Sequence, residues 1–201
     1  INAMAYDLQH HRLIDRLGGQ GDMAARRIRM VTEQAFIDDP LRLLRAFRMA
    51  AVLDFAIEPE TLAAITRQGY RISRPAGERL RTELLQLMAR PASAHQIQVM
   101  SESGLLLHLL PEMQPMQHCR QNRHHDFDVY EHTLRAYAAT EKCLQNASDI
   151  VDALGKRYHA PLYRRSAGAI LKYAVLLHDI GKPGTRRLDA DGDAHFHGHA
   201  Q

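Results

Sequence analysis

The sequence predicts a mainly α-helical protein, in which a helical bundle is followed by a second helical domain and preceded by a short β-hairpin. Between about residues 38 and 110, apolar residues recur at spacings of three and four, which is the period of an amphipathic helix. Brief loops containing glycine or proline separate these segments, as is typical of a compact bundle. The first thirty residues instead contain two short alternating runs around His10 and His11, which indicate a hairpin.

The N-terminal segment is expected to contain a hairpin formed by residues 1–8 and 12–17, followed by one helix. Three glycines between residues 18 and 21 interrupt the chain, and Asp22 is positioned to cap a helix that extends through Val31. The glycines are too loosely arranged for a phosphate-binding loop, because no Gly-Lys-Ser/Thr follows them. Since an isolated hairpin is barely stable in water, we expect this segment to be the end of a larger sheet.

The central region predicts a series of short helices. In the first of them, Leu41, Leu44, Phe47 and Ala51 follow the helical period. Helices are then expected at 61–68 (entered through Pro59 and ended by Gly69), 76–89, 93–100 and 105–110 (stopped by Pro111). A stretch without periodicity at 111–123 indicates a domain boundary, after which helices are expected at 128–144, around 151–154 and at 166–177.

Composition excludes several classes of protein. The chain has 201 residues, of which 45% are hydrophobic, so it can bury a core and is not intrinsically disordered. No apolar run reaches the roughly 18–20 residues of a membrane span, since Lys172 interrupts the best one, at 167–177. Cys119 and Cys143 form no Cys-x-x-Cys pair, which argues against a disulfide framework or a thiolate zinc site. We therefore expect a soluble, cytoplasmic protein without a membrane partner.

The strongest candidate site is the dipeptide His178-Asp179, which ends the apolar helix at 166–177. An imidazole and a carboxylate placed against a core are costly unless both are paired or bind a cation. His132 lies upstream, and three further histidines crowd a short stretch downstream: His195, His197 and His199. Such a set suits a first-row divalent metal, which could activate water for attack on a phosphate ester. The alternative is a satisfied core histidine beside a polar residue at a helix end.

The second candidate site is Asp38-Asp39-Pro40-Leu41-Arg42. On a helix, Asp39 and Arg42 project about 60° apart, so a carboxylate acceptor and a guanidinium donor share one edge. This pair can present a fixed hydrogen-bonding edge to a nucleobase. The alternative is that Asp38 or Asp39 caps the helix that begins at Pro40, with a surface ion pair contributing less than about 1 kcal/mol.

The third candidate is a basic groove. The chain has an excess of arginine, a net charge of +3 and a pI near 9.0, which leaves room for a phosphate-rich partner. Few aromatic residues accompany the arginines, so a base-stacking platform is not indicated. The alternative is a solvated basic face. The arginines that could line a groove following an RNA backbone are Arg26, Arg27, Arg29, Arg42, Arg45, Arg48, Arg71, Arg74, Arg79 and Arg81.

Several ordered motifs in the sequence resemble those of one family of enzymes. They are Ile1 to Ala5, Leu13-Ile14-Asp15 with Gly18-Gly19 and Asp22, Ile28 to Val31, Asp38 to Ala46, Ala76 to Leu84, and Gly104 to Glu112. Together they resemble the tRNA nucleotidyltransferases (CCA-adding enzymes) and the bacterial poly(A) polymerases. The segment from Asp38 is similar to the family's Glu-Asp-x-x-Arg motif, with Asp38 in place of the usual Glu. His132, His178-Asp179 and residues 195–199 are similar to the HD phosphohydrolase domain appended in some bacterial members.

This resemblance implies an enzyme that adds CMP and AMP to RNA 3′ ends without a template, with tRNA or another RNA 3′ end, ATP and CTP as partners. It implies nucleotide-binding roles for Asp39, Arg42, Arg45 and Arg79. Asp39 and Arg42 match the pair that mimics a Watson–Crick edge, whereas Asp38 is expected to support the helix end. The carboxylates that hold Mg²⁺ in the family belong to strands preceding Ile1, so we expect no polymerisation by this chain alone.

The resemblance further implies a metal site made of His132, His178, Asp179 and His199, for Mn, Ni, Fe, Co or Zn. HD domains complete this site with an Asp from a later helix, so we expect the domain to be incomplete at Gln201. The expected division is a remnant of the nucleotidyltransferase head at 1–31, a helical neck that binds nucleotide and RNA at 32–117, and the HD domain at 118–201. The alternative function is an HD-type phosphohydrolase acting on phosphate esters or RNA cyclic phosphate ends.

Overall fold

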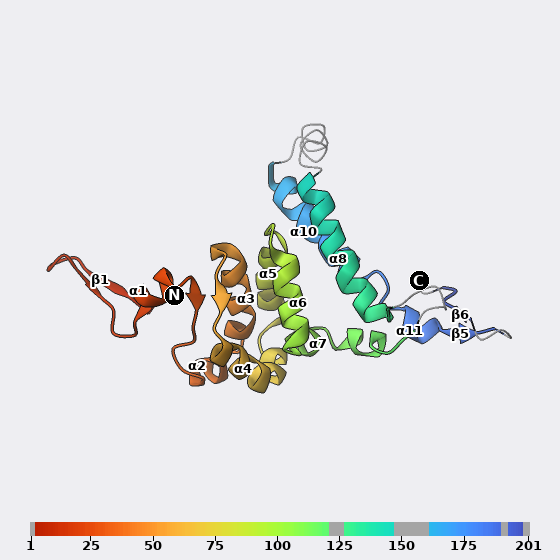
Figure 1. Ribbon diagram of the computed structural model, residues 1–201, viewed down its shortest axis with the longest axis horizontal. Helices are drawn as coiled ribbons and strands as arrows, with labels where there is room; N and C mark the ends of the chain where they lie inside the picture. Colours follow the sequence, from red (N-terminus) through yellow and green to blue (C-terminus); the bar gives the residue numbers. More distant parts are fainter. Residues whose placement is uncertain (1–2, 121–126, 147–160, 190–192, 199–201) are drawn as a thin grey trace.

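The computed structural model describes residues 3–120, 127–146, 161–189 and 193–198, and it is mainly helical. Figure 1 shows an elongated molecule, in which a hairpin extends from one side of a central group of helices and a helical pair rises from the other. The described strands form three small two-stranded sheets. The predicted fold class is therefore confirmed. No helix among the described residues is both long enough and apolar enough to span a membrane.

The N-terminal hairpin is confirmed. Strand β1 (Ala5–Asp7) pairs antiparallel with β2 (Arg12–Ile14). The Asp7 carboxylate stabilises the turn, because its Oδ1 accepts hydrogen bonds from the backbone N–H groups of Gln9 and His10. No third strand among the described residues pairs with these two. The hairpin extends away from the helices (Figure 1).

The prediction that the helix beginning near Asp22 extends through Val31 is wrong. Helix α1 spans only Gly19–Ala24, and the chain then enters the short strand β3 (Arg27–Ile28). The carboxylate that supports the start of α1 is Asp15, which accepts from the backbone N–H groups of Gly19 and Gln20 at 2.7 and 2.8 Å. Asp22 lies inside the helix and does not cap it.

Asp22 is held by two arginines that the sequence places beyond the helix. Its carboxylate accepts hydrogen bonds from Arg29 and from Arg27. These bonds, the Arg29 bond first, hold the pKa of Asp22 below its ordinary value. The chain turns after α1, where Arg26 adopts φ 51°, and this turn brings both guanidinium groups to the Asp22 carboxylate.

Strand β3 pairs in parallel with β4 (Ala56–Ile57), so that Ile28 lies opposite Ile57. This pairing joins the N-terminal segment to the central helices across the boundary predicted near residue 31. Between the two strands the chain forms helix α2 (Gln34–Asp38) and helix α3 (Leu41–Leu53).

The central helices agree with the predicted segments to within a few residues. After α3 they are α4 (Pro59–Gln68), the 3₁₀ helix η1 (Gly69–Ser73), α5 (Gly77–Met88), α6 (Ser93–Glu102), α7 (Leu105–Leu109) and the 3₁₀ helix η2 (Pro111–Met116). Their apolar faces meet in one core, whose largest fully buried side chains include Phe47, Leu43, Leu44, Ile65, Ile72, Leu87, Met88, Ile97, Met100, Leu105 and Leu106. Gly104 adopts φ +76°, which lets the chain turn from α6 into α7.

The second helical part is a pair, α8 (Val129–Asn146) and α10 (Pro161–Leu177), which lie side by side and contact α6 and α5 respectively (Figure 1). The predicted helix around 151–154 lies outside the described residues. After α10 come α11 (Lys182–Thr185), β5 (Arg187–Leu188) and β6 (Ala194–His195), the last two pairing antiparallel.

Candidate nucleotide cleft and candidate metal centre

A cleft of about 210 Å³ lies between helices α3 and α5. Two of the predicted nucleotide-binding residues, Arg45 and Arg79, line it from the two helices. The complete lining is Leu41, Arg45, Glu78, Arg79, Thr82 and Glu83. The packing of α3 against α5 thus brings together segments that lie some forty positions apart in the sequence.

The Asp39 carboxylate lies between two guanidinium groups, one of which, that of Arg79, also lines the cleft. Its Oδ2 is 3.5 Å from Arg79 Nη2 and 4.0 Å from Arg42 Nε. Arg42 also donates a 3.3 Å hydrogen bond to the carbonyl oxygen of Ala35, which restrains its side chain against α2. The structure therefore brings Asp39, Arg42 and Arg79 together, and Arg45 lies on the wall of the same cleft.

The expectation that Asp38 or Asp39 caps α3 is wrong. The N-cap position of α3 is Pro40, and no side chain caps it. Asp38 is the last residue of α2, where its Oδ1 accepts a 2.8 Å bond from Gln34 Nε2. Asp39 has an extended backbone (φ −139°, ψ 92°), because a single residue connects α2 to Pro40. Its carboxylate consequently points toward the arginines and is not used by the helix end.

Glu83 is a cleft residue that sequence reasoning missed. It is only 7% exposed, and its carboxylate accepts hydrogen bonds from Arg45 Nε (3.2 Å) and Nη2 (3.1 Å) at one oxygen and from Arg48 Nε at the other. One buried carboxylate thus fixes two arginines of α3. The sequence signal is the i, i+3 spacing of Arg45 and Arg48, which places two guanidinium groups on one side of a largely apolar helix and favours an acid nearby.

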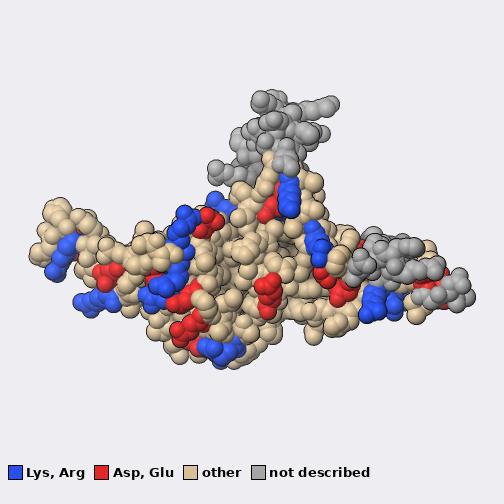
Figure 2. All heavy atoms as spheres, viewed as in Figure 1, with Lys and Arg blue, Asp and Glu red and all other residues tan. Residues whose placement is uncertain are grey.

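Many of the arginines predicted to line a basic groove are held by acidic side chains. Arg26 pairs with Asp54, Arg27 and Arg29 share Asp22, and Arg45 and Arg48 share Glu83. Figure 2 accordingly shows acidic groups beside the basic ones on the visible face, and not one unbroken basic band.

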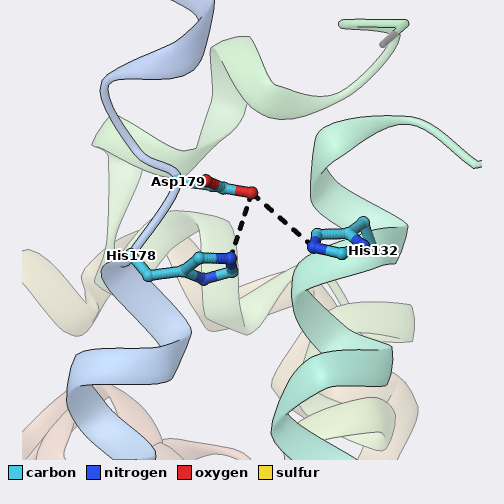
Figure 3. Close-up of side chains that lie close together, drawn as sticks. All are labelled: His132, His178 and Asp179. Carbon is cyan, nitrogen blue, oxygen red and sulfur yellow. Dashed lines mark ion pairs between the residues drawn. The ribbon is translucent and has the colours of Figure 1, made fainter. Parts of the chain in front are cut away.

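The predicted histidine–aspartate cluster is assembled from two separate helices. His132 comes from the first turn of α8, whereas His178 and Asp179 directly follow α10 (Figure 3). Asp179 Oδ2 lies 3.0 Å from His178 Nε2 and 3.7 Å from His132 Nε2, and the ligand atoms of all three residues lie within 4.8 Å of one another. Asp179 is 2% exposed, so its carboxylate is the buried member of the cluster.

This geometry fits a first-row divalent metal. Two ligand atoms that are each about 2.1 Å from one ion lie about 3.0–3.4 Å apart, depending on the angle between them. The separation of Asp179 from His178 is inside this range, and that of His132 is slightly above it. A donor set of two imidazoles and one carboxylate binds such ions in preference to Mg²⁺.

The His178 ring is oriented by the backbone. Its Nδ1 lies 2.7 Å from the carbonyl oxygen of Val175, and because a carbonyl only accepts, Nδ1 carries the proton. In the neutral ring, the lone pair is then on Nε2, which faces Asp179. A backbone carbonyl that fixes the tautomer in this way is the usual support of a histidine that binds a metal.

Lys182 is the cationic neighbour of this cluster. Its Nζ lies 2.8 Å from Asp179 Oδ2 and 5.5 Å from the centre of the Phe196 ring. His195 does not join the cluster, because its Nε2 lies 2.8 Å from Asp189 Oδ2 and its ring stacks on His197. The fourth predicted ligand, His199, lies outside the described residues.

Comparison with known proteins shows which class of protein the chain resembles. Residues 54–117 match a family described as "Probable RNA and SrmB- binding site of polymerase A". The chain is 37% identical to the A-adding tRNA nucleotidyltransferase of Deinococcus radiodurans, over 99% of the chain and 42% of that protein. It is 35% identical to the Multifunctional CCA protein of Halorhodospira halophila, over 90% of the chain and 40% of that protein. The chain is therefore similar to tRNA nucleotidyltransferases over nearly all of its own length, and it spans about two fifths of the length of these relatives.

Solved structures show the same fold. A tRNA nucleotidyltransferase complexed with a primer tRNA and an incoming ATP analog matches 88% of the chain and 46% of its own length, with a TM-score of 0.61 and 22% identity. A tRNA-processing enzyme in an apo form matches 88% of the chain and 45% of its own length, with a TM-score of 0.60 and 24% identity. The helical arrangement of the chain is therefore that of part of these enzymes.

Proposed function

We propose that the chain supplies the nucleotide-selecting and RNA-binding part of an enzyme that adds CMP or AMP to the 3′ end of tRNA or another RNA. The observation that carries this proposal is the Asp39 carboxylate between Arg42 and Arg79, the second of which lines the cleft. The names of the relatives support it, since they include an A-adding tRNA nucleotidyltransferase, a CC-adding tRNA nucleotidyltransferase and a Multifunctional CCA protein. In this proposal residues 32–117 form the neck, residues 1–31 belong to the head, and residues 118–201 form the HD domain.

The chemistry of the pair favours two of the four bases. Cytosine and adenine each present an amino donor beside a ring-nitrogen acceptor on the pairing edge, whereas uracil and guanine present a ring N–H donor beside a carbonyl acceptor. A carboxylate acceptor beside a guanidinium donor is complementary to the first arrangement. In our proposal Asp39 accepts from the amino group, Arg42 donates to the ring nitrogen, and Arg45 and Arg79 pair with the phosphates of CTP or ATP.

Nucleotidyl transfer in this family is expected to use Mg²⁺. Within the described ranges the one cluster of potential metal ligands contains two histidines, so we assign no Mg²⁺ ligand to this part of the chain. The contribution that we propose for its own residues is therefore recognition of the base, charge neutralisation at the phosphates and contact with the RNA.

We expect calorimetry to detect ATP and CTP binding to the chain, and we expect Asp39→Ala and Arg42→Ala each to weaken it by about tenfold or more, since each removes one half of the pairing edge. Arg81→Ala is the matched control, because Arg81 is exposed on the same helix as Arg79 but does not line the cleft. Unchanged affinity in both the Asp39 and the Arg42 variants would refute the assignment.

The histidine cluster favours a second candidate function, an HD-type phosphohydrolase. We propose that His132, His178 and Asp179, with His199 as a fourth ligand, hold a Mn, Ni, Fe, Co or Zn ion. When bound, the ion lowers the pKa of water and supplies hydroxide for attack on a phosphate ester. The residues of the chain contribute the buried Asp179 carboxylate, the oriented Nε2 of His178 and, at Lys182, a cation suited to the phosphate.

Metal binding is expected to depend on the three clustered side chains. Mn²⁺ or Ni²⁺ binding measured by calorimetry and by elemental analysis should be lost in Asp179→Ala and weakened about tenfold or more in His178→Ala. His195→Ala should bind metal as the unmodified chain does, because His195 contacts Asp189 and lies outside the cluster. Hydrolysis of bis(p-nitrophenyl) phosphate should follow the metal content. A chain that retains no metal and hydrolyses nothing with any metal added contradicts this candidate.

A further inference from the structure

A buried lysine joins the helical pair α8–α10 to the central helices. Lys172 lies in the middle of α10 and is 4% exposed. Its three N–H groups are all used, because Nζ lies 2.7 Å from Glu141 Oε1, 3.0 Å from Ser93 Oγ and 2.9 Å from the carbonyl oxygen of Arg90. An ammonium group has three donors, so Lys172 is fully satisfied without water.

Its partner Glu141, on α8, is equally buried and caps helix α6. The carboxylate accepts hydrogen bonds from the backbone N–H groups of Ser93 (3.0 Å) and Ala94 (2.9 Å), which are the first two residues of α6. It also accepts from Ser93 Oγ at 2.6 Å. The network is completed by Tyr137, whose hydroxyl lies 2.9 Å from Ser93 Oγ. Because Ser93 donates to Glu141, Tyr137 is the donor in this last bond.

The two charges match the helix ends that they contact. Arg90 lies two residues after the last residue of α5, so the ammonium group of Lys172 lies near the negative end of that helix. Glu141 binds the positive end of the next helix, α6. Each charge therefore interacts favourably with a helix dipole as well as with the other charge. One residue of α8 and one of α10 thus hold the turn between α5 and α6 from two sides.

The same helices carry both candidate sites. Arg79 lies in the first turn of α5 and Glu83 near its middle, whereas Lys172 contacts the turn after its end, about 15 Å along the axis from Arg79. His178 and Asp179 lie about 10 Å further along the axis of α10 from Lys172. The junction is therefore connected to the nucleotide cleft through one continuous helix and to the histidine cluster through another.

We infer that Lys172, Glu141, Ser93 and Tyr137 form a latch that fixes the α8–α10 pair to the α5–α6 turn and so holds the histidine cluster at a constant position relative to the cleft. Breaking the latch releases α8 and α10 while α3, α4 and α7 keep their fold, because these three helices make none of its contacts. This inference does not depend on either proposed function, since it requires neither nucleotide nor metal.

Hydrogen exchange measured by mass spectrometry on the full 201-residue chain tests the latch. In Lys172→Met a buried carboxylate loses its counter-ion, so amide exchange in α8 and α10 should accelerate on the order of a hundredfold. Exchange in α3, α4 and α7 should be unchanged. Lys142→Met is the matched control, because Lys142 is exposed on the same helix as Glu141 and should leave exchange as in the unmodified chain.

The double variant Lys172→Met with Glu141→Gln removes both charges and leaves an amide to cap α6. Its exchange in α8 and α10 should be slower than in Lys172→Met alone, since no unpaired charge remains buried. Equal acceleration in every helix, no acceleration in Lys172→Met, or a double variant that exchanges as fast as the single one would each overturn the inference. If neither variant folds, the network belongs to the general core and the inference is likewise overturned.

Discussion

Glu83→Ala is expected to lower the free energy of unfolding by about 2–3 kcal/mol and to weaken ATP and CTP binding by about tenfold. The buried carboxylate accepts three hydrogen bonds from guanidinium groups, and bonds to charged partners contribute the most to stability. The loss stays below that of a fully buried pair, because Arg45 is 41% and Arg48 19% exposed and both can regain water. Nucleotide binding should weaken because Arg45 is then no longer held at the cleft.

The measurement combines urea unfolding with calorimetric titration of ATP. Glu83→Gln keeps the shape of the side chain and one acceptor, so it should lose less stability than Glu83→Ala. Glu78→Ala is the matched control, since Glu78 is exposed on the same helix and lines the same cleft. It should change stability by no more than about 0.5 kcal/mol. If Glu78→Ala and Glu83→Ala lowered stability equally, the buried carboxylate would have no special role.

Phe47→Ala is expected to destabilise the chain by about 3–5 kcal/mol, the largest effect of a single substitution that we predict. The side chain is fully buried in the core on α3, together with Leu43 and Leu44. Its removal takes away buried apolar area and leaves a cavity that the surrounding helices can fill only in part.

Thermal unfolding followed by circular dichroism measures this effect. The control is Leu53→Ala in the last turn of the same helix, where the side chain is 38% exposed and the loss should be about 1 kcal/mol or less. A loss below about 1 kcal/mol in Phe47→Ala would mean that α3 is not the centre of the core.

The helices of the central part could be predicted because each one has a local signal. Leu44 and Phe47 follow the helical period, Pro59 begins α4, and Gly104 and Pro111 bound α7. The features that could not be predicted are non-local. Strands β3 and β4 have two residues each, and what makes them strands is a partner 29 positions away. The predicted helix through Val31 failed for the same reason, since Arg27 and Ile28 pair with β4.

The candidate sites likewise contain some residues with a local sequence signal and others whose role depends on tertiary structure. Asp39 and Arg42 could be singled out because they form a short charged motif at the start of a helix. His178-Asp179 could be singled out because two titratable side chains end an apolar helix. Glu83 and Lys172 could not be assigned, although an acidic residue in an amphipathic helix and a lysine in an apolar one were visible. Whether such a charge faces water or a buried partner depends on which helix packs against it, and that is decided by tertiary structure.

The parallel pairing of β3 with β4 has a consequence for the order of folding. Ile28 can meet Ile57 only after the intervening chain has closed a long loop, which costs conformational entropy. Helix α3, which lies inside that loop, forms through local contacts and reduces the cost once it is in place. Strand β3 precedes α3 in the chain, yet it is expected to reach its final position after that helix.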